Sequence, residues 1–344
     1  MSFFKTEAPE PLVAKHLVAV DVGYGYVKAV SAAGRRVCFP SIAAPRSGDL
    51  GINDLLGGRG PGHAVSVRYE DGCKGEYLVG EAARGSYLAS AFLGAEKPAD
   101  LHDLLLLTAC ALLTGGDDCV VHADLAVGLP LAFYKAQRAA LAARLENLAA
   151  WVGVDDENER KICFTRVLVI PQGVGVVFSQ RLPHGRGYAG VIDVGQYTTD
   201  YLLVDLSTMT PVVDACGSVE AGCHLVAQRI NQAYLVKTGR PLPPRLEQWA
   251  LEALKDGCAL PYRGGELDLS EEFDAAVRDA AATITRQVLS AWRDIVDMIA
   301  VTYLAGGGAL LFGEHLSALP RPVPVKEPVF ANALGYLRML EQTA

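Results

Sequence analysis

The chain has 344 residues, 51% of them hydrophobic, and a formal net charge of −8. This length exceeds one ordinary core of about 100–150 residues and predicts two lobes, while the acidic balance disfavours direct contact with nucleic acid. The eight cysteines form no C-x-x-C pair, and no apolar run reaches the length of a membrane span. We expect a cytoplasmic protein with reduced thiols, no membrane contact and a flexible leader over residues 1–14.

The first predicted element is a hairpin over Leu17–Val30, which reads L-V-A-V-D-V-G-Y-G-Y-V-K-A-V. Two apolar runs rich in β-branched residues flank a glycine-containing turn, as in two paired strands. The glycines Gly23 and Gly25 invite comparison with the dinucleotide motif G-x-G-x-x-G. Lys28 replaces the third glycine and a strand follows it, so the context of that motif is missing. Lys28 is instead suited to contact a phosphate as a mobile point charge.

A small subdomain is predicted next, over residues 34–98. Its expected elements are a third strand over Arg36–Pro40, a glycine-rich loop over Ser47–Gly62 and a hairpin over Tyr69–Gly85. The glycine-rich passage lacks G-x-x-x-x-G-K-[ST], so it predicts an exposed loop and not a phosphate loop.

The rest of the first lobe is predicted to alternate helices and strands. The expected elements are an apolar helix over Asp100–Leu113, a buried strand over Cys119–Leu129, a helix over Phe133–Trp151 and a strand from Cys163 to Pro171. His102 is expected on the surface of the first of these helices.

Gln172 is a lone polar residue between apolar runs, at the predicted crossover from lobe I (15–172) to lobe II (173–344). Its side chain could reach the terminal phosphate of a nucleotide. Alternatively, it could satisfy backbone groups near the turn, and the sequence leaves both interpretations open.

A second corner of the same kind, V-I-D-V-G-Q-Y-T-T-D, opens the other half of the chain. Asp193 follows Asp21 by half the length of the chain, which indicates an ancient duplication. Gly195 lets backbone N–H groups approach an anion, and the hydroxyls of Thr198 and Thr199 add donors. A carboxylate beside phosphate indicates an intervening divalent cation, Mg²⁺ held through water. Two such hairpins facing each other predict a clamp on a metal–nucleotide.

Lobe II is predicted to continue with an amphipathic helix, an inserted subdomain over residues 223–272 and a long helix over Ser270–Ala300. Glu220 and Gly222 precede the amphipathic helix, so its N-terminal turn is predicted to face ligand. The alternative is that Glu220 is only an acidic first-turn residue favoured by the helix dipole.

Three consecutive glycines, Gly306, Gly307 and Gly308, follow a strand that begins near Val301. Glycines let a flat base or ribose lie against the backbone at the C-terminal end of a strand, where open α/β sheets bind ligands. These glycines are the predicted adenosine contacts.

The ordered set of motifs resembles the five nucleotide-site segments of the actin-like ATPase superfamily. The motifs are D-V-G-Y-G-Y-V-K from Asp21, P-Q-G at Gln172, D-V-G-Q-Y-T-T-D from Asp193, E-A-G from Glu220 and A-G-G-G ending at Gly308. Further details are similar to the ParM/StbA plasmid-segregation branch and its archaeal actin relatives. They are the segments Phe39–Ser41, Tyr77–Glu81, Gly128–Pro130 and Pro328–Tyr336.

This resemblance implies an α/β fold of two ribonuclease-H-like lobes, each with a smaller subdomain, closing over Mg-ATP. It also implies that a C-terminal helix, about residues 329–342, packs back on lobe I. Asp21 and Asp193 would arrange the hydrated Mg²⁺, and Gln172 would orient the attacking water. Many ParM-like relatives carry Glu at that last position whereas actin carries Gln, so the resemblance predicts slow hydrolysis. The residues expected to cradle the phosphates are Gly23, Tyr24, Gly25, Lys28, Gly195, Thr198 and Thr199.

The resemblance further implies a slow ATPase that forms head-to-tail filaments with itself when ATP is bound and loosens them when ADP remains. DNA would be reached through an adaptor protein, in keeping with the acidic charge. Two alternatives are a small-molecule kinase of the same superfamily and a monomeric ATP-dependent, chaperone-like switch.

Overall fold

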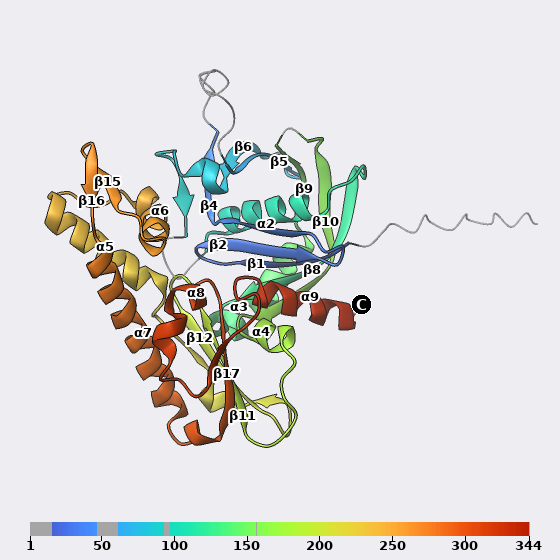
Figure 1. Cartoon of the computed structure of the whole chain (residues 1–344). Coiled ribbons are helices and arrows are strands. Elements are labelled where there is room, and N and C mark those ends of the chain that lie inside the picture. Colours follow the sequence, from blue (N-terminus) through green and yellow to red (C-terminus); the bar gives the residue numbers. More distant parts are fainter. Residues whose placement is uncertain (1–15, 47–60, 93–96, 156, 344) are drawn as a thin grey trace, which may run out of the picture.

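The computed structural model describes residues 16–46, 61–92, 97–155 and 157–343, which form two α/β lobes around separate sheets (Figure 1). The expected two-lobed α/β organisation is confirmed. The predicted leader and most of the predicted glycine-rich loop, residues 47–60, lie outside the described residues. None of the described helices is both long enough and apolar enough to cross a bilayer.

The sheet of the first lobe contains strands from across the N-terminal half of the described chain. Its strands are β1 (His16–Val22), β2 (Tyr26–Ser31), β3 (Arg36–Pro40), β4 (Ile42–Pro45), β5 (His63–Tyr69), β6 (Lys74–Val79), β7 (Ser90–Ala91), β8 (Val120–Leu129), β9 (Ala149–Val154) and β10 (Arg160–Pro171). Their spatial order is β3-β2-β1-β8-β10-β9-β5-β6-β4-β7. The strands β1, β8 and β10 run parallel to one another, and their C-terminal halves are largely apolar and buried.

The helices of the first lobe are η1 (Gly80–Ala83), α2 (Ala99–Leu113) and α3 (Leu131–Glu146). Strand alternation decides which residues meet them: Val18, Val20 and Val22 of β1 pack into the cluster that contains α2. The intervening Ala19 packs on the opposite face. Asp21 follows Ala19 by two positions and therefore points to that opposite face, at the C-terminal end of β1.

Three local predictions in the first lobe are corrected. His102 is buried, 5% exposed, because α2 is covered on nearly every side, and its Nδ1 lies 3.0 Å from Asp103 Oδ1. The helix expected to reach Trp151 ends at Glu146, since residues 149–154 pair with β5 and β10 as β9. The hairpin expected over Tyr69–Gly85 starts earlier, with β5, and its second strand ends in η1. For residues 149–154, pairing with distant strands overrides the helical pattern of the sequence.

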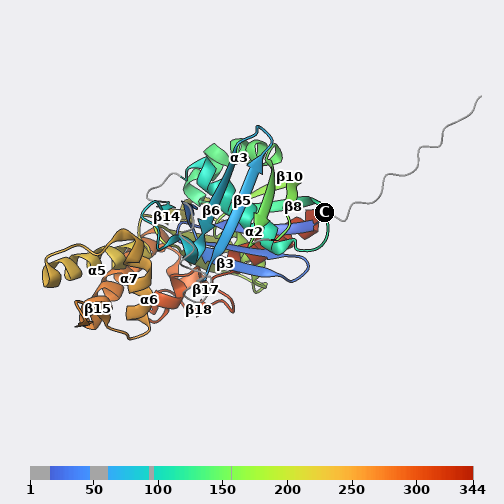
Figure 2. The same cartoon turned by 90° about the horizontal axis from the view of Figure 1, so that it is seen from above.

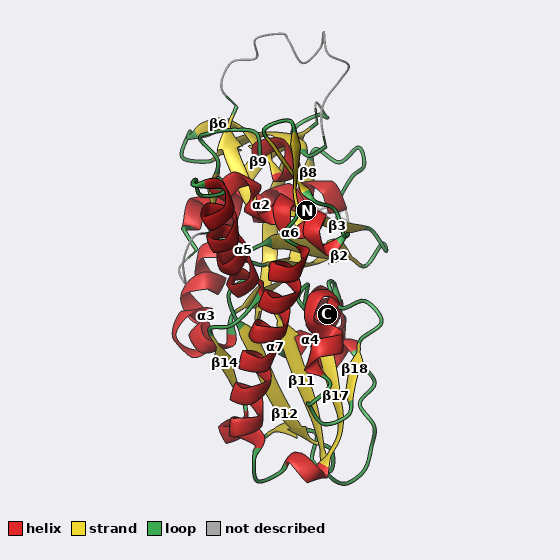
Figure 3. Ribbon diagram, turned by 60° about the vertical axis from the view of Figure 1, so that its left-hand side comes forward, coloured by secondary structure: helices red, strands yellow, loops and turns green. Residues whose placement is uncertain are grey.

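The second lobe has a smaller sheet in the order β13-β12-β11-β17-β18, with β14 paired to β12 (Figure 3). The strands are β11 (Tyr188–Val194), β12 (Thr199–Asp205), β13 (Thr210–Pro211), β14 (Gly217–Val219), β17 (Ile299–Ala305) and β18 (Pro322–Pro324), with a separate hairpin of β15 (Leu260–Tyr262) and β16 (Gly265–Leu267). The helices are α4 (Val174–Ser179), η2 (Val213–Ala215), α5 (Cys223–Thr238), α6 (Pro244–Lys255), α7 (Ser270–Trp292), η3 (Val296–Met298), α8 (Ala309–Phe312), η4 (Gly313–Leu316) and α9 (Ala331–Thr343).

The long helix α7 covers one face of the second sheet and ends at Trp292, not at Ala300 as predicted. Trp292 is fully buried and its Nε1 donates a hydrogen bond to the Ala215 carbonyl (2.9 Å). The chain then turns and enters β17 at Ile299, which runs parallel to β11. Helices α5 and α6 and strand β15 lie beside α7 at one end of the molecule (Figure 2), and they share one hydrophobic core with α7 and the second sheet.

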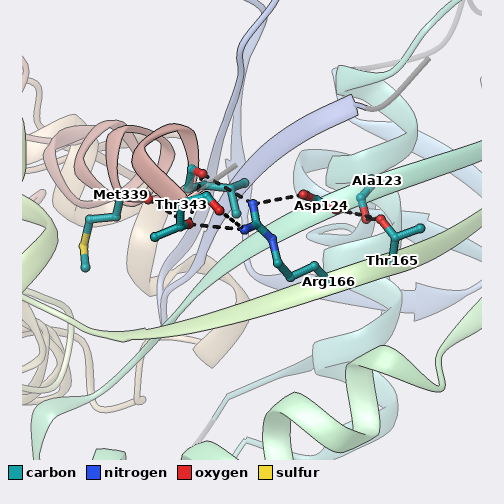
Figure 4. Close-up of polar contacts among 7 residues, drawn as sticks. Ala123, Asp124, Thr165, Arg166, Met339 and Thr343 are labelled. Atoms are coloured by element: carbon teal, nitrogen blue, oxygen red, sulfur yellow. Dashed lines mark hydrogen bonds and ion pairs between the residues drawn. The ribbon is translucent and has the colours of Figure 1, made fainter. Parts of the chain in front are cut away.

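The C-terminal helix α9 returns to the first lobe. Ala333, Tyr336 and Leu340 pack against the face of the first sheet opposite α2. Arg166 holds the end of α9, because its guanidinium donates to the carbonyls of Thr343 (2.5 Å) and Leu340 (3.4 Å) while it pairs with Asp124 (3.0 Å; Figure 4). In the view of Figure 1 the helix therefore lies below β1 and above the strands of the second sheet, between the two lobes.

Candidate functional site

A cavity of about 310 Å³ lies between the lobes, where the tips of the β1–β2 and β11–β12 hairpins meet. Ligand cavities of this kind are usually about 300–1,000 Å³. Twelve of the residues predicted for the site line it: Asp21, Gly23, Tyr24, Gly25, Lys28, Gln172, Asp193, Gly195, Thr198, Gly306, Gly307 and Gly308. The α6 residues Gln248, Leu251, Glu252 and Lys255 also line it and were not predicted.

The first hairpin joins its strands through a tight turn in which the Gly23 N–H donates to the Tyr26 carbonyl (3.0 Å). Asp21 and Lys28 are directly opposite each other in the β1–β2 register, and Lys28 Nζ lies 3.4 Å from Asp21 Oδ2. A Cβ atom on Gly23 would lie 2.8 Å from Lys28 Nζ, so this position requires glycine. Burial opposes the charge on Lys28, yet the Asp21 and Asp193 carboxylates raise its pKa above the usual value.

The second hairpin has the same turn, with the Gly195 N–H donating to the Thr198 carbonyl (2.8 Å). Here the directly opposed pair is Asp193 and Asp200, so two carboxylates face each other. Burial and the Asp21 charge raise the pKa of Asp193 to about 6. Burial and the Asp193 charge raise the pKa of Asp200 to about 7. Asp200 was not among the predicted site residues, although it closes the D-V-G-Q-Y-T-T-D segment.

Gln172 and Asn332 join the two hairpins from beneath. Gln172 is buried and its Nε2 donates to Asp21 Oδ1 (2.8 Å). Asn332, near the start of α9, donates from Nδ2 to Asp193 Oδ2 (2.6 Å), and its Oδ1 accepts from the Gly173 N–H (3.0 Å). Sequence reasoning gave Asn332 no role, although it lies in the Pro328–Tyr336 segment.

The donor set suits a hydrated divalent cation. Asp21, Asp193 and Asp200 are all buried beside one lysine, Lys28, and hard carboxylate oxygens are the ligands that Mg²⁺ prefers. Asp200 Oδ1 is buried without a hydrogen-bond partner among the described residues. Within the described ranges, no three His, Cys, Asp or Glu side chains converge closely enough to ligate a metal directly. The residues therefore fit a cation held largely through water.

The three glycines after β17 differ in their surroundings. Gly306 has φ +82°, and a Cβ atom there would collide with the Val194 carbonyl. A Cβ atom on Gly308 would collide with the Val194 side chain, whereas one on Gly307 would meet nothing within 4 Å. Gly306 and Gly308 are thus required by close packing on the end of β11, and Gly307 leaves the backbone open toward the cavity.

Three predicted contact residues lie outside the cavity lining. Thr199 is fully buried and donates to the Ala221 carbonyl (2.7 Å), so its hydroxyl is already used. Glu220 is exposed. Gly222 packs against the carbonyls of Gly195 and Gln196, where a Cβ atom would lie 2.7 Å away from each oxygen. The first N–H groups of α5 donate to these same carbonyls, so the turn anchors the helix to the second hairpin.

A polar cluster closes the cavity on the side of α6, and we call Tyr26, Arg84, Gln248 and Glu252 the mouth cluster. The Tyr26 hydroxyl donates to the Glu252 carboxylate and accepts from Gln248 Nε2 (3.3 Å). The Arg84 guanidinium lies 3.6 Å from the same Glu252 oxygen. Tyr26 and Arg84 belong to the first lobe, whereas Gln248 and Glu252 belong to α6. The cluster therefore joins the lobes across the cavity.

Two family models match adjoining parts of the chain. The model described as the N-terminal domain of actin-like proteins matches residues 19–175, and the model of the C-terminal part of the MreB-like archaeal actin homologue matches residues 191–318. An archaeal actin homolog from Thermoplasma acidophilum is 28% identical over 338 residues, which are 95% of this chain and 99% of the relative.

Solved structures agree with these matches. A non-polymerisable quadruple mutant of pCBH ParM is 26% identical with a TM-score of 0.83 and covers 96% of this chain and 100% of its own. An archaeal actin homolog in complex with ADP is 27% identical with a TM-score of 0.76, covering 95% and 99%. A subunit of a 15-stranded ParM filament from Clostridium botulinum shares the fold, with 24% identity and a TM-score of 0.86 over 96% of this chain and 100% of its own.

The two lobes, with their paired hairpins around a shared cavity, define the actin-like fold. The chain belongs to the actin-like proteins, since the two family models together match most of it, and it is similar both to ParM and to the archaeal actin homologues.

Proposed function

We propose that this protein binds Mg-ATP in the cavity between its lobes, hydrolyses it slowly, and forms head-to-tail filaments in response. The observation that supports this proposal most strongly is the pair of hairpin tips facing one cavity, with Asp21, Asp193 and Gln172 beneath them. The ADP complex of the archaeal actin homolog supports a nucleotide as the ligand, and the ParM filament supports self-assembly.

In this proposal both hairpins contribute contacts to the bound Mg-ATP. When bound, Mg²⁺ would neutralise phosphate charge, and Asp21 and Asp193 would hold its water ligands. The backbone N–H group of Gly25 would donate to a phosphate oxygen. The N–H groups of Gly23 and Gly195 are bonded within their turns, so these two glycines would contribute by placing no Cβ atom in the way of the phosphate. The residues expected to add contacts are Tyr24, Lys28 and Thr198. Tyr24 carries no small hydroxyl group, so the turn of the first hairpin would contact the phosphate through its backbone.

Gln172 supports slow turnover. Its Nε2 is engaged by Asp21, which leaves Oε1 to accept a hydrogen bond from an attacking water. A neutral amide can orient water but is a poor general base, so it would not remove the proton. We expect Gln172→Ala to reduce hydrolysis at least tenfold while ATP still binds. Phosphate release and nucleotide affinity measured on the same preparation would separate the two effects, and unchanged turnover would remove this role.

The proposed cellular role is DNA or plasmid segregation through a DNA-binding adaptor, in the cytoplasm. The ParM relatives motivate it. The formal charge of −8 argues against direct contact between the filament and DNA. An adaptor would therefore carry the basic, DNA-facing surface.

High-speed pelleting with light scattering and negative-stain imaging tests the central proposal. We expect polymer with Mg-ATP or a non-hydrolysable analogue, less with Mg-ADP, and none for Asp193→Ala. Asp214→Ala is the matched control, because Asp214 is an exposed residue of the same lobe outside the cavity. A protein that binds ATP yet stays soluble in every nucleotide state would instead support the chaperone-like switch. ATP turnover stimulated by a small molecule would support a kinase of the same superfamily.

A further inference from the structure

A second cavity, of about 350 Å³, lies in the first lobe between α2 and α3. Its walls are Tyr24, Lys97, Ala99, His102, Gly128, Leu129, Pro130, Phe133, Gln137, Ala140, Leu141 and Arg144. Three of these side chains can carry positive charge, and neither Asp nor Glu occurs among these lining residues. Such a lining is unexpected in a chain whose net charge is −8.

Lys97 occupies one side of this cavity, and the Asp21 and Asp200 carboxylates, which do not line the cavity, attract it from behind. Its ammonium group donates to the Val22 carbonyl and lies 4.4 Å from the centroid of the Tyr24 ring and 5.6 Å from that of Phe92. Burial lowers the pKa of Lys97 to about 8, which is the expected response of an ammonium removed from water. An anion beside Lys97 would favour the charged form of the side chain and offset the cost of burying it.

Arg144 and His102 form another part of the wall, and both are oriented by Asp103. Asp103 Oδ1 accepts from the Arg144 guanidinium and lies 3.0 Å from His102 Nδ1. Asp103 itself does not line the cavity. Asp103 pairs with Arg144, and Asp21 and Asp200 attract Lys97, but none of these three carboxylates lines the cavity, so the wall itself presents positive charge.

Tyr24 separates this cavity from the nucleotide cavity, since it lines both. Its ring packs edge-on against Tyr197 of the second hairpin (5.3 Å between centroids) and against Phe92 (6.1 Å). Gly23 and Gly25 flank Tyr24 in the turn that forms the first phosphate corner. The second cavity therefore adjoins the phosphate end of the first one through a single aromatic side chain.

We propose that the second cavity is a binding site for an oxyanion, held by Lys97 and Arg144. Inorganic phosphate is the occupant that its position beside the phosphate corner favours, and only this choice of occupant rests on the proposed ATPase function. The apolar part of the wall, Leu129, Phe133 and Leu141, leaves room for an organic group attached to the anion. A phosphate monoester would use the same charged side of the site.

Isothermal titration of the full-length protein with inorganic phosphate tests the proposal, with the nucleotide cavity first saturated by Mg²⁺ and a non-hydrolysable ATP analogue. We expect phosphate to bind the wild-type protein under these conditions and the affinity to fall at least tenfold in Lys97→Met. Lys135→Met is the matched control, because Lys135 is exposed on α3 and does not line the cavity. Phenyl phosphate in place of phosphate distinguishes the two sources of the anion: tighter binding indicates an organic occupant, and weaker binding indicates free phosphate.

Loss of phosphate binding in the presence of the analogue, or equal affinity in Lys97→Met and wild type, would overturn the inference. Arg144→Gln provides a second test if Lys97→Met does not fold. Lys28→Met separates the two cavities in the protein without nucleotide. Phosphate binding that depends on Lys28 and not on Lys97 belongs to the nucleotide cavity and refutes the second site. If the protein binds no ATP but still binds phosphate in a way that depends on Lys97, the proposed oxyanion site stands although the proposed ATPase function fails.

Discussion

The β1–β2 and β11–β12 hairpins have the same turn hydrogen bond and the same register at their tips, yet their charges differ. Asp21 faces Lys28 across the first pair of strands, whereas Asp193 faces Asp200 at the same register position of the second. Lys28 pairs with Asp21 at 3.4 Å, while Asp200 keeps one buried oxygen without a partner among the described residues. The first hairpin is therefore close to charge-neutral, and the second is doubly acidic.

This difference shows how a duplicated scaffold becomes an asymmetric site. Both aspartates at the strand ends point to the α9 side of their sheets, because Ala19 and Val191, two residues earlier, pack on that side. Lys28 contacts Asp21, and Lys97 attracts Asp21 and Asp200 only at longer range, so the two facing carboxylates of the second hairpin would be stabilised by positive charge from a ligand. A metal–nucleotide would supply this charge and would join the lobes as it does so.

Loss of the lysine gives the largest expected effect. Lys28→Met leaves Asp21 as an uncompensated buried charge, and breaking such a pair costs about 3–5 kcal/mol of unfolding free energy. Chemical denaturation of the ligand-free protein at pH 7.5 measures this loss. The double variant Lys28→Met with Asp21→Asn should recover most of it, and failure to recover would show that the lysine acts through packing instead of charge.

Neutralising a carboxylate of the second hairpin should have the opposite effect and stabilise the ligand-free protein. The folded-state pKa of Asp200, about 7, lies above its usual value, so the folded state favours the protonated carboxyl. Its contribution to stability is complete below pH about 4 and is lost as the pH rises through about 7. Asp200→Asn should therefore stabilise the ligand-free protein at pH 8 by about 2–3 kcal/mol and change little at pH 4.

Asp205, on the same strand β12, provides the control for this experiment. The Ser207 hydroxyl and N–H lower the pKa of Asp205, so Asp205→Asn should give no gain at pH 8. Thermal melts of both variants across pH 4–8 would contradict the proposed asymmetry if the Asp200→Asn gain were independent of pH.

Asn332 ties the second hairpin to α9, and its removal should have a moderate effect. Asn332→Ala removes a 2.6 Å hydrogen bond to Asp193, and hydrogen bonds to charged groups contribute about 1.5–3 kcal/mol. We expect the Mg-ATP affinity to fall at least tenfold and the pKa of Asp193 to rise further. Titration with a fluorescent ATP analogue between pH 6 and 8 measures both, and an affinity unchanged across this range would exclude the role.

The mouth cluster should show the smallest effect. Tyr26→Phe removes the hydroxyl that joins the first lobe to Glu252 and Gln248, a loss of about 0.5–1.5 kcal/mol. Nucleotide release in stopped-flow chase experiments should become about two- to tenfold faster, with association little changed. Tyr262→Phe is the control, since Tyr262 lies in the β15–β16 hairpin and does not line the nucleotide cavity. Equal release rates in wild type and Tyr26→Phe would show that the cluster does not restrain the lobes.

Local patterns predicted the elements that carry most of the site. Both hairpins have apolar, largely buried runs around a glycine turn, and both form where the pattern places them. The end of β17 before three consecutive glycines was also predicted from the sequence, because a strand cannot continue through them. Yet only the surroundings separate Gly306 and Gly308, which pack on β11, from Gly307, which faces open space.

Predictions failed where distant segments decide the outcome. Residues 149–154 read as the end of a helix but become β9, because β5 and β10 offer strand partners on both sides. The hydroxyl of Thr199 was expected at a phosphate and is taken by the Ala221 carbonyl. No local signal marks Asn332 or Glu252, since each acquires its partner from a segment more than 100 residues away, as the separations of 139 for Asn332–Asp193 and 226 for Tyr26–Glu252 show.

The sequence by itself determined the two hairpins, their shared spacing and the residue types at their tips, because these depend on strand alternation and on turns of a few residues. Tertiary structure alone decided that Gln172 donates to Asp21, that Asn332 supports Asp193, and that Lys97 lies behind Tyr24. The physical reason is that buried charge is stabilised by whatever lies within a few ångströms, and in this fold those neighbours come from segments far apart in the chain.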